Sequence, residues 1–290
     1  MPTVRLGSGV AFALAAGLMW GLVFVAPLML PQYPAALQSV ARYAAFGFLC
    51  IPLAWFDRSA LRSLTREDWV EALKLALVGN LIYYTLLASS IQRTGGALST
   101  VIIGTLPVGI ALVNHEEWGQ AVQQDVTGAS YSIGVLLAIG AVVCWTWYPL
   151  RNSDWLRNHP GRSPRVWATA QGLVTLPLAL LGYVVLWVWM ALTGDPFEMP
   201  LGPEPGFFVL LMVSVGLLAS WLGTLCWNEA SQRLPTTLLG QLIVFETLAG
   251  LAYTFWWRGD WPATIALVGV GLLLVGVLWA VRVKPVLRPA

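Results

Sequence analysis

The sequence predicts an all-α polytopic membrane protein built from two copies of one helical unit. Of its 290 residues, 58% are hydrophobic and 10% are charged, whereas globular domains carry about 25% charged residues. Its apolar runs reach about 20 residues, the length that a helix needs to cross a hydrocarbon core of roughly 30 Å. In addition, segments of the N-terminal half recur in the C-terminal half at a fixed spacing.

Nine apolar segments are long enough to be membrane-spanning helices. Backbone polar groups have no water partners in lipid, so each spanning segment is expected to be helical. Several follow helix-start signals, such as Thr65 before the third, Pro164 in the sixth and Pro262 in the ninth. The predicted spans are 7–30, 35–56, 69–91, 95–113, 131–150, 164–193, 206–229, 234–257 and 261–281.

The duplication runs without a gap over the first two predicted helices. Gly9 lies eleven residues before Trp20, and Gly134 lies eleven residues before Trp145. The same shift of 125 positions aligns Ala45, Gly47, Pro52 and Leu53 with Ala170, Gly172, Pro177 and Leu178. Further along the chain the shift becomes 140, where Gln92-Arg93 aligns with Gln232-Arg233.

The second copy contains one more readable helix than the first. Span 234–257 is followed by span 261–281, whereas 95–113 leads directly into an acidic loop. Val108 aligns with Leu248 at a shift of 140, but Gly109 aligns with Gly276 at a shift of 167. The difference between these shifts indicates that about 27 residues are missing near residue 108, which leaves an incomplete fifth helix. The alternative is a single helix over 95–113 and nine spans in all.

The distribution of basic residues favours the additional crossing. Lys and Arg in short loops stay on the cytoplasmic side. With nine spans, five basic loop residues lie on the N-terminal side and nine on the other; one more crossing between 95 and 131 makes the split twelve against two. Both termini are then cytoplasmic, and the acidic loops 114–130 and 194–206 face outside.

Five helices per copy make the second copy enter the membrane from the opposite face. We therefore expect a ten-helix, five-plus-five inverted repeat, with 1–114 as the first repeat, 115–130 as an external loop and 131–290 as the second repeat. Inverted repeats place substrate sites near the bilayer midplane, at the interface between the copies.

Two segments resemble the drug/metabolite transporter superfamily. Residues 16–24 read Ala-Gly-Leu-Met-Trp-Gly-Leu-Val-Phe, similar to the small-x-x-Trp-Gly stretch of that superfamily's first helix. Residues 245–249 resemble its Glu-Pro-Val segment, although Thr247 replaces the proline, and the second copy has Trp145-Thr146 in place of Trp-Gly. Within the superfamily the chain is most similar to the bacterial aromatic amino acid exporters of the YddG family.

The resemblance implies two EamA-like repeats that enclose a central cavity and work by alternating access in the bacterial inner membrane. It also implies a monomer that needs no cofactor. The expected partners are a small-molecule substrate, an aromatic or bulky hydrophobic amino acid, and the lipid bilayer.

Ten side chains at membrane depth are candidates for lining the substrate cavity. Unpaired polar groups in hydrocarbon cost several kcal/mol, so their presence there indicates a function or a partner. A zwitterionic substrate needs polar partners for its charged groups and apolar walls for its ring. The candidates are Trp20, Gln38, Arg42, Asn80, Tyr83, Tyr84, Trp145, Gln171, Gln241 and Glu246.

Each candidate has a structural alternative. Arg42 could attract a carboxylate or extend to the nearer interface. Glu246 could carry a proton or hold an amide such as Gln241. The Trp20–Trp145 pair could form cavity walls, or these residues could only pack helices.

Two further groups of residues could have a structural role and not a transport role. Asn80, Tyr83 and Tyr84 share one helical face and could point at a cavity or pack with satisfied hydroxyls. Glu229 and Arg233 are spaced i, i+4 and are expected to pair with each other.

Several classes of protein are disfavoured by missing signals. The sequence has no phosphate-binding Gly-x-x-x-x-Gly-Lys-Ser/Thr loop, no metal-type spacing around His115 or His159, and no basic stripe for nucleic acid. We therefore expect an exporter. The alternatives are a related transporter of another small solute, such as a nucleobase, nucleotide sugar or toxic amine, and, more remotely, an integral membrane enzyme that modifies lipids.

Overall fold

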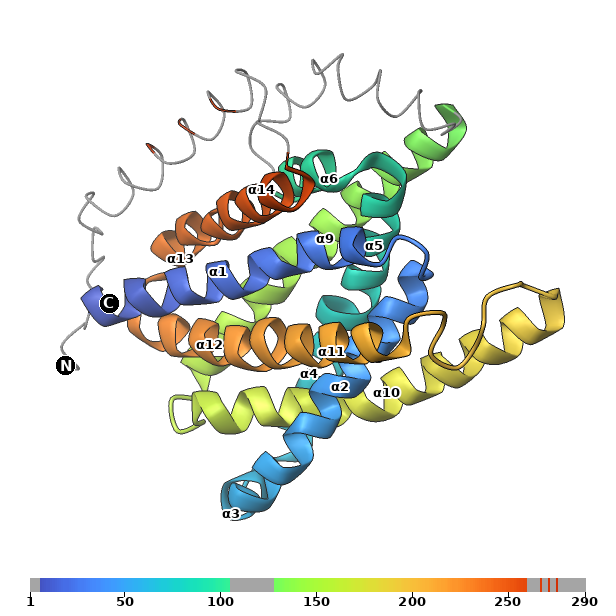
Figure 1. The fold of residues 1–290 in the computed structure, drawn as a ribbon. Coiled ribbons are helices and arrows are strands. Elements are labelled where there is room, and N and C mark those ends of the chain that lie inside the picture. The colour runs from blue at the N-terminus through green and yellow to red at the C-terminus, as the bar shows by residue number, and fades with distance from the viewer. Residues whose placement is uncertain (1–5, 105–127, 260–266, 268–270, 272–274, 276–290) are drawn as a thin grey trace.

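The computed structural model describes residues 6–104 and 128–259 together with positions 267, 271 and 275. These residues form a bundle of helices (Figure 1). Seven helical segments in the described ranges are long and apolar enough to cross a membrane. They are Leu6–Met29, Ala35–Phe56, Arg66–Thr94, Gly128–Asn158, Pro164–Thr193, Pro205–Arg233 and Leu238–Arg258. The hypothesis of a missing segment near residue 108, residues 115–127 of the predicted loop and most of span 261–281 fall outside the described residues. Residues 128–130, predicted as the end of this loop, belong to a helix instead.

Several predicted spans are divided into shorter elements. The helices are α1 (Leu6–Met29), α2 (Ala35–Phe56), α3 (Arg58–Arg62), α4 (Arg66–Leu75), α5 (Tyr83–Thr94), α6 (Gly96–Gly104), α9 (Gly128–Asn158), α10 (Pro164–Thr193), α11 (Pro205–Val215), α12 (Gly223–Arg233), α13 (Thr236–Leu242) and α14 (Phe245–Arg258). Two π-helical segments, η1 (Ala76–Ile82) and η2 (Gly216–Leu222), join α4 to α5 and α11 to α12.

The π-helical segments are a departure from the regular helices predicted over 69–91 and 206–229. They occupy equivalent positions, because η1 and η2 are related by the shift of 140. In η2 the N–H of Gly223 bonds to the carbonyl of Leu218, five residues back. The N–H of Tyr83 likewise reaches Val78 after η1. Such segments are rare in proteins as a whole, but they often occur at functional sites. Here each copy of the repeat contains one at the equivalent position.

The first helix of each copy packs against the third span of the other copy through a glycine. A Cβ atom added to Gly9 would lie 2.7 Å from Leu234 Cδ2, and one added to Gly134 would lie 2.5 Å from Thr94 Cγ2. Gly9 is equivalent to Gly134, and Thr94 is equivalent to Leu234. The contacts α1·α12 and α9·α5 are therefore the same contact made twice.

These contacts show that the two copies run through the bundle in opposite directions. α1 begins at the face where α12 ends, at the left of Figure 1. Three crossings later α5 ends at the opposite face, beside the beginning of α9. α1 and α9 therefore start on opposite faces, which is the arrangement of an inverted repeat.

The position of α9 also bears on the number of crossings. α6 begins at Gly96, directly after α5 ends, and α9 begins at that same face. The residues between α6 and α9, on which the nine-span alternative depends, lie outside the described ranges.

The second helices of the two copies cross at an equivalent pair of glycines. A Cβ on Gly47 would lie 2.5 Å from Leu176 Cβ, and one on Gly172 would lie 2.2 Å from the sulfur of Cys50. Gly47 and Gly172 are related by the shift of 125. The approximate twofold axis that relates the copies therefore passes close to the α2–α10 crossing.

Three ion pairs join the two copies at the face where α1 begins. Arg151 pairs with Glu71, Arg162 with Asp68, and Arg165 with Asp57. All three carboxylates are buried.

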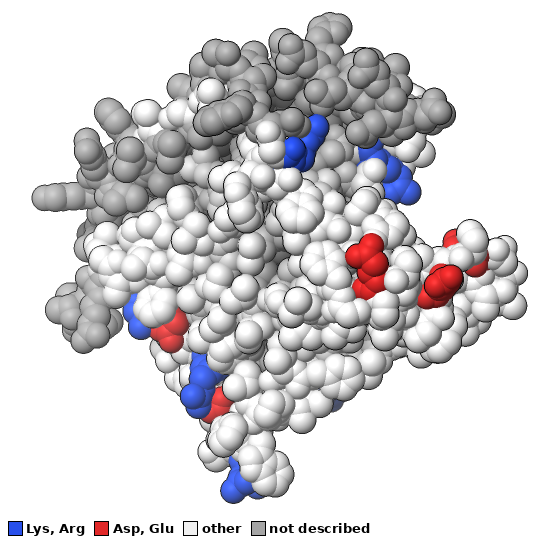
Figure 2. All heavy atoms as spheres, viewed as in Figure 1, with Lys and Arg blue, Asp and Glu red and all other residues white. Residues whose placement is uncertain are grey.

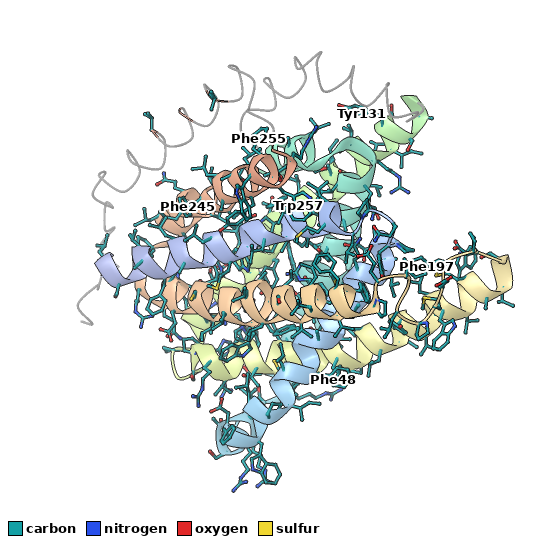
Figure 3. All side chains as sticks on the ribbon, viewed as in Figure 1. Phe48, Tyr131, Phe197, Phe245, Phe255 and Trp257 are labelled. Atoms are coloured by element: carbon teal, nitrogen blue, oxygen red, sulfur yellow. The ribbon has the colours of Figure 1, made fainter. Side chains whose placement is uncertain are left out.

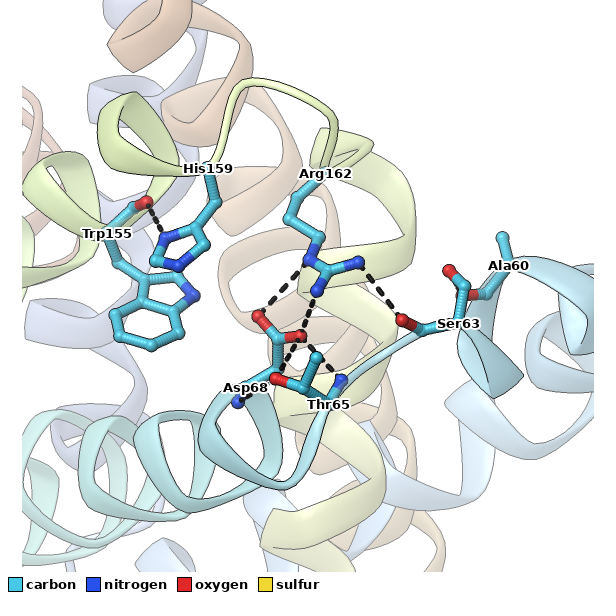
Figure 4. A network of polar contacts seen from close by, with 7 residues as sticks. All are labelled: Ala60, Ser63, Thr65, Asp68, Trp155, His159 and Arg162. Atoms are coloured by element: carbon cyan, nitrogen blue, oxygen red, sulfur yellow. Dashed lines mark hydrogen bonds and ion pairs between the residues drawn. The ribbon is translucent and has the colours of Figure 1, made fainter.

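The Asp68 pair belongs to a wider polar network (Figure 4). Arg162 Nη1 also donates to the carbonyl of Ser63 at 3.1 Å, and Asp68 forms a capping box with Thr65 at the start of α4. At this face, second-copy arginines therefore hold first-copy carboxylates and helix ends.

The opposite face is joined by hydrogen bonds that involve no Arg or Lys among the described residues, including one from Gln32 to the Glu204 carboxylate at 2.9 Å. Tyr33 Oη donates to the carbonyl of Leu201 at 2.9 Å and accepts from the Glu204 N–H at 2.8 Å. Acidic side chains gather near the α10–α11 connection at the right of Figure 2. Elsewhere side chains fill the spaces between the helices, while Phe48 and Trp257 are exposed on the outside (Figure 3).

We predict that Gly79→Ala destabilises the bundle and that Tyr148→Val, added to it, restores stability. A Cβ on Gly79 would lie 2.0 Å from Tyr148 Cδ2, and such overpacking costs about 1–3 kcal/mol. At the equivalent contact Ala219 replaces Gly79 and Val23 replaces Tyr148, so the larger residue is combined there with a smaller partner. Thermal unfolding in detergent measures the effect.

Gly7→Ala is the control, because nothing lies within 4 Å of a Cβ at Gly7. Equal unfolding temperatures for the Gly79→Ala and Gly7→Ala variants would contradict the proposed close packing.

Candidate functional site

A small cavity lies at the interface between the two copies. Its volume is about 10 Å³, roughly the space that one water molecule needs. Its walls come from α1, α2, η1, α5, α9, η2 and α12. The lining residues are Trp20, Val23, Arg42, Tyr43, Gly79, Asn80, Tyr83, Trp145, Tyr148, Ala219, Ser220 and Thr224.

Eight of the lining residues are pairs related by the duplication. The shift of 125 relates Trp20 to Trp145 and Val23 to Tyr148, and the shift of 140 relates Gly79 to Ala219 and Asn80 to Ser220. A cavity lined by equivalent residues from both copies lies on the axis that relates them. This is the position in which an inverted repeat places a substrate site.

Five of the twelve lining residues are aromatic, and four of these rings pack on one another. The Trp145 ring stacks on Tyr83 at a centroid distance of 4.5 Å and on Tyr148 at 5.6 Å. Trp20 meets Trp145 edge-on at 4.8 Å and lies 5.2 Å from Trp227. A planar ligand could enter only if these rings separated, so the structure represents a closed state of the site.

The two equivalent tryptophans have different polar surroundings. Trp20 Nε1 donates to the carbonyl of Ala219 at 3.0 Å. This carbonyl is accessible beside Gly223, where an added Cβ would lie 2.8 Å from Trp20 Nε1. The first copy has Tyr83 in place of Gly223, and its ring stacks on Trp145, whose Nε1 makes no hydrogen bond. The helices around the site are therefore related by the duplication, but the contacts of the two equivalent tryptophans differ.

Three polar side chains complete the cavity wall. Arg42 is 3% exposed and donates from Nε to Ser220 Oγ at 3.0 Å. Its guanidinium also lies over the ring of Tyr84, 4.2 Å from the centroid. Asn80 donates to Thr175 Oγ1 at 3.3 Å. The expectation that Arg42 extends to the interface is wrong, because α2 carries it into the bundle.

Glu246 lies near the cavity but is not among its lining residues. It is in the first turn of α14 and is 2% exposed. The carboxyl lies close to the Trp145 indole and the Tyr83 hydroxyl, but its Oε2 atom has no hydrogen-bond partner. The predicted helix over 234–257 is in fact broken between α13 and α14. This break places the carboxyl at a helix N-terminus, where the helix dipole favours negative charge.

The structure brings five of the ten predicted candidates together in the cavity wall: Trp20, Arg42, Asn80, Tyr83 and Trp145. Tyr84 lies behind the wall against Arg42.

Gln38, Gln171 and Gln241 lie elsewhere. Gln38 donates to the carbonyls of Leu30 and Tyr33, so it stabilises the end of α1 and the turn after it. Gln171 bonds to Tyr148 and Asn152. Gln241 is exposed, so it does not hold Glu246.

Four polar residues of the wall were not among the ten candidates: Tyr43, Tyr148, Ser220 and Thr224. The duplication contained the signal for three of them, and Ser220 is the counterpart of the candidate Asn80. Tyr148 is the counterpart of Val23, three residues after each paired tryptophan, and Thr224 is the counterpart of Tyr84. Tyr43 had no such signal.

The expected Glu229–Arg233 ion pair is confirmed. Within the described ranges, no group of His, Cys, Asp and Glu could hold a metal ion.

Comparisons with known proteins agree with this architecture. The profile of the EamA-like transporter family matches residues 7–116. The chain is 50% identical over 309 residues, 96% of this chain and 96% of the relative, to a protein named inner membrane protein YtfF from Escherichia coli (strain K12). The aligned length exceeds the 290 residues of the chain, so the relative contains residues that have no counterpart here.

A solved structure described only as a crystal structure of a protein shows the same fold. It has a TM-score of 0.65 at 18% identity and covers 94% of this chain and 97% of that chain. The predicted superfamily is thus confirmed, whereas the relative's name specifies no substrate. Since the relative aligns with nearly the whole chain, family membership extends beyond the matched residues 7–116. The chain belongs to the EamA-like transporter family of the drug/metabolite transporter superfamily, whose members are transporters and not enzymes.

Proposed function

We propose that the protein exports aromatic or other bulky hydrophobic amino acids across the bacterial inner membrane by alternating access. The stacked aromatic wall of Trp20, Tyr83, Trp145 and Tyr148 is the observation that carries this proposal. Such rings offer faces and edges to a planar side chain, each pair contributing about 0.5–1.5 kcal/mol beyond burial. The name of the YtfF relative supports the inner membrane as the location.

The cavity wall and the residues next to it contain one charged group for each end of an amino acid. Arg42 lies on one side of the aromatic wall, and Glu246 lies beside Trp145. Binding at a closed, buried site excludes water and strengthens such charged contacts. A nucleobase or a toxic amine is the second candidate substrate, because it also has a flat or apolar body, but it would leave Arg42 without an anion.

The complete protein of this type is proposed to have ten helices in two groups of five, with both termini in the cytoplasm. α6 and α9 begin at the same face of the bundle, which supports the additional crossing. The longer aligned length of the relative supports residues having been lost from this chain. Basic residues at the face where α1 begins support its cytoplasmic assignment. A monomer is sufficient, since both copies that form the cavity belong to one chain.

We expect vesicles containing the purified protein to take up labelled Phe or Trp without added nucleotide. Unlabelled aromatic amino acids should compete, and Gly or Ala should compete at least about tenfold less well, because they bury little area against the rings. Empty vesicles are the control. Failure of every amino acid to compete or accumulate would transfer the proposal to another small solute.

Opening of the cytoplasmic face should require the ion pairs between the copies to separate. We predict that Arg151→Glu, which places two like charges together, increases labelling of a Ser231→Cys reporter by a cytoplasmic thiol reagent. Ser231 is buried, 1% exposed, between α9 and α12. An increase of up to about fivefold is expected, since half-exposed pairs contribute roughly 0.2–1 kcal/mol. The native cysteines are replaced beforehand.

Two variants make this test specific. The exchange Glu71→Arg with Arg151→Glu should restore slow labelling. Glu229→Arg reverses a charge next to Arg233 within one helix and should leave labelling unchanged. Labelling that rises equally in the Glu229→Arg variant would show that general loosening, and not opening between the copies, is being measured.

Glu246 is the candidate for proton coupling. If the proton gradient drives export through this carboxyl, Glu246→Gln should reduce gradient-driven transport at least about tenfold. Exchange of substrate between vesicle compartments at equal pH should persist, because no net proton movement is needed there. Normal gradient-driven export by the variant at every pH would exclude this role.

A further inference from the structure

Arg42 carries a positive charge that no described carboxylate neutralises. It is 3% exposed, in the middle of α2, and it forms no ion pair with any described acidic residue. The described acids that do pair, Asp57, Asp68, Glu71 and Glu229, all lie with other arginines at the face where α1 begins. An unpaired buried charge is strongly destabilising. An anion bound next to Arg42 in the cavity would therefore be stabilised by its positive charge.

The guanidinium is also only partly used as a hydrogen-bond donor. It has five N–H groups, of which Nε donates to Ser220 Oγ. The rings of Tyr43 and Tyr84 lie 4.8 Å and 4.2 Å from its central carbon, and such cation–π contacts are attractive but leave the N–H groups available. Nη1 is buried and has no acceptor. A planar donor with free N–H groups matches the two oxygens of a carboxylate.

The surroundings of Arg42 contain further donors and aromatic rings. Asn80 and Ser220 line the same cavity, and the buried hydroxyls of Tyr83 and Tyr84 have no partner. Glu246, the other buried charge-bearing group, lies against Trp145 and makes no ion pair with Arg42. The two charge-bearing groups are therefore not paired with each other.

We infer that Arg42 is the anion-binding group of the transport site and that the transported solute carries a carboxylate next to an aromatic or bulky apolar body. This inference rests on the proposed transport function and narrows its substrate class. It excludes amines and neutral nucleobases, which could use the rings but would leave the guanidinium unpaired. Arg42 thereby determines specificity at the carboxyl end, whatever stands at the other end of the solute.

The test uses compounds with one ring and different charged groups, each added to the purified protein in thermal-unfolding measurements. The compounds are 3-phenylpropionate, phenylalanine, phenethylamine and phenyl phosphate. Ligands that bind the folded state raise its unfolding temperature. We expect stabilisation by phenylpropionate and phenylalanine and none by phenethylamine at the same concentration.

Substitution of Arg42 assigns the effect to one side chain. Arg42→Gln should weaken the binding of phenylpropionate and of phenylalanine by about 10–100-fold, which corresponds to the loss of a hydrogen bond to a charged group. Arg42→Lys keeps the charge but loses the planar fork, so it should weaken them less, and it serves if the Gln variant does not fold. Lys74→Gln removes a basic residue that is 57% exposed outside the cavity and should change nothing.

The outcomes separate this inference from the proposed function. Binding of phenylpropionate without phenylalanine would reject amino acid export and keep Arg42 as the carboxylate site. Equal stabilisation by phenethylamine, or unchanged carboxylate affinity in both Arg42 variants, would overturn the inference while leaving aromatic transport intact. Tighter binding of phenyl phosphate than of either carboxylate would also overturn it, by assigning a phosphate as the anion.

Discussion

The structure depends on one close contact that occurs twice. α1 approaches α12 at Gly9, and α9 approaches α5 at Gly134, each so closely that a single added carbon would collide. Helices in lipid gain little from the hydrophobic effect and associate through close packing at small residues. Because each contact joins different copies, neither copy can bury its first helix alone. The interface between the copies is consequently the core of the protein, and the cavity lies within it.

The same contact explains why the site is asymmetric. Each first helix places a tryptophan against a π-helical segment, but Gly223 admits Trp20 to a backbone carbonyl and Tyr83 keeps Trp145 from an equivalent bond. Arg42 has a counterpart, Trp167, which bonds to Asn152 away from the cavity. The duplication thus accounts for the equivalent helices around the cavity. Differences between the copies at single positions account for the Arg42 cation, the free Trp145 indole N–H and the stacked rings, none of which recurs at the position related by the duplication.

Sequence reasoning found the frame because a fixed shift is a long-range signal. The pairs Gly9–Gly134 and Trp20–Trp145 were recognised without coordinates. Five of the ten residues predicted to line the cavity do line it. The π-helical segments were not, because hydrophobic periodicity does not distinguish one extra residue per turn inside an apolar run. Gln38 was misplaced for another reason. A buried amide serves a helix end as well as a ligand, and only the positions of the Leu30 and Tyr33 carbonyls decide between them.

The two faces of the bundle are equivalent in topology but not in chemistry. At one face the α9–α10 segment meets the α2–α4 segment through Arg151, Arg162 and Arg165. At the other, the equivalent meeting of the α1–α2 turn with the α10–α11 connection uses Tyr33 and the backbone of Leu201 and Glu204. Opening the first face exposes three carboxylates to water, which solvates them well, while opening the second separates hydrogen bonds of Tyr33 and Gln32 and no described ion pair. In the proposed alternating-access cycle both openings have to be energetically accessible, and the relative free energies of the two open states set their populations. Under this proposal, the duplication provides two equivalent openings, and the unequal contacts at the two faces make their populations differ.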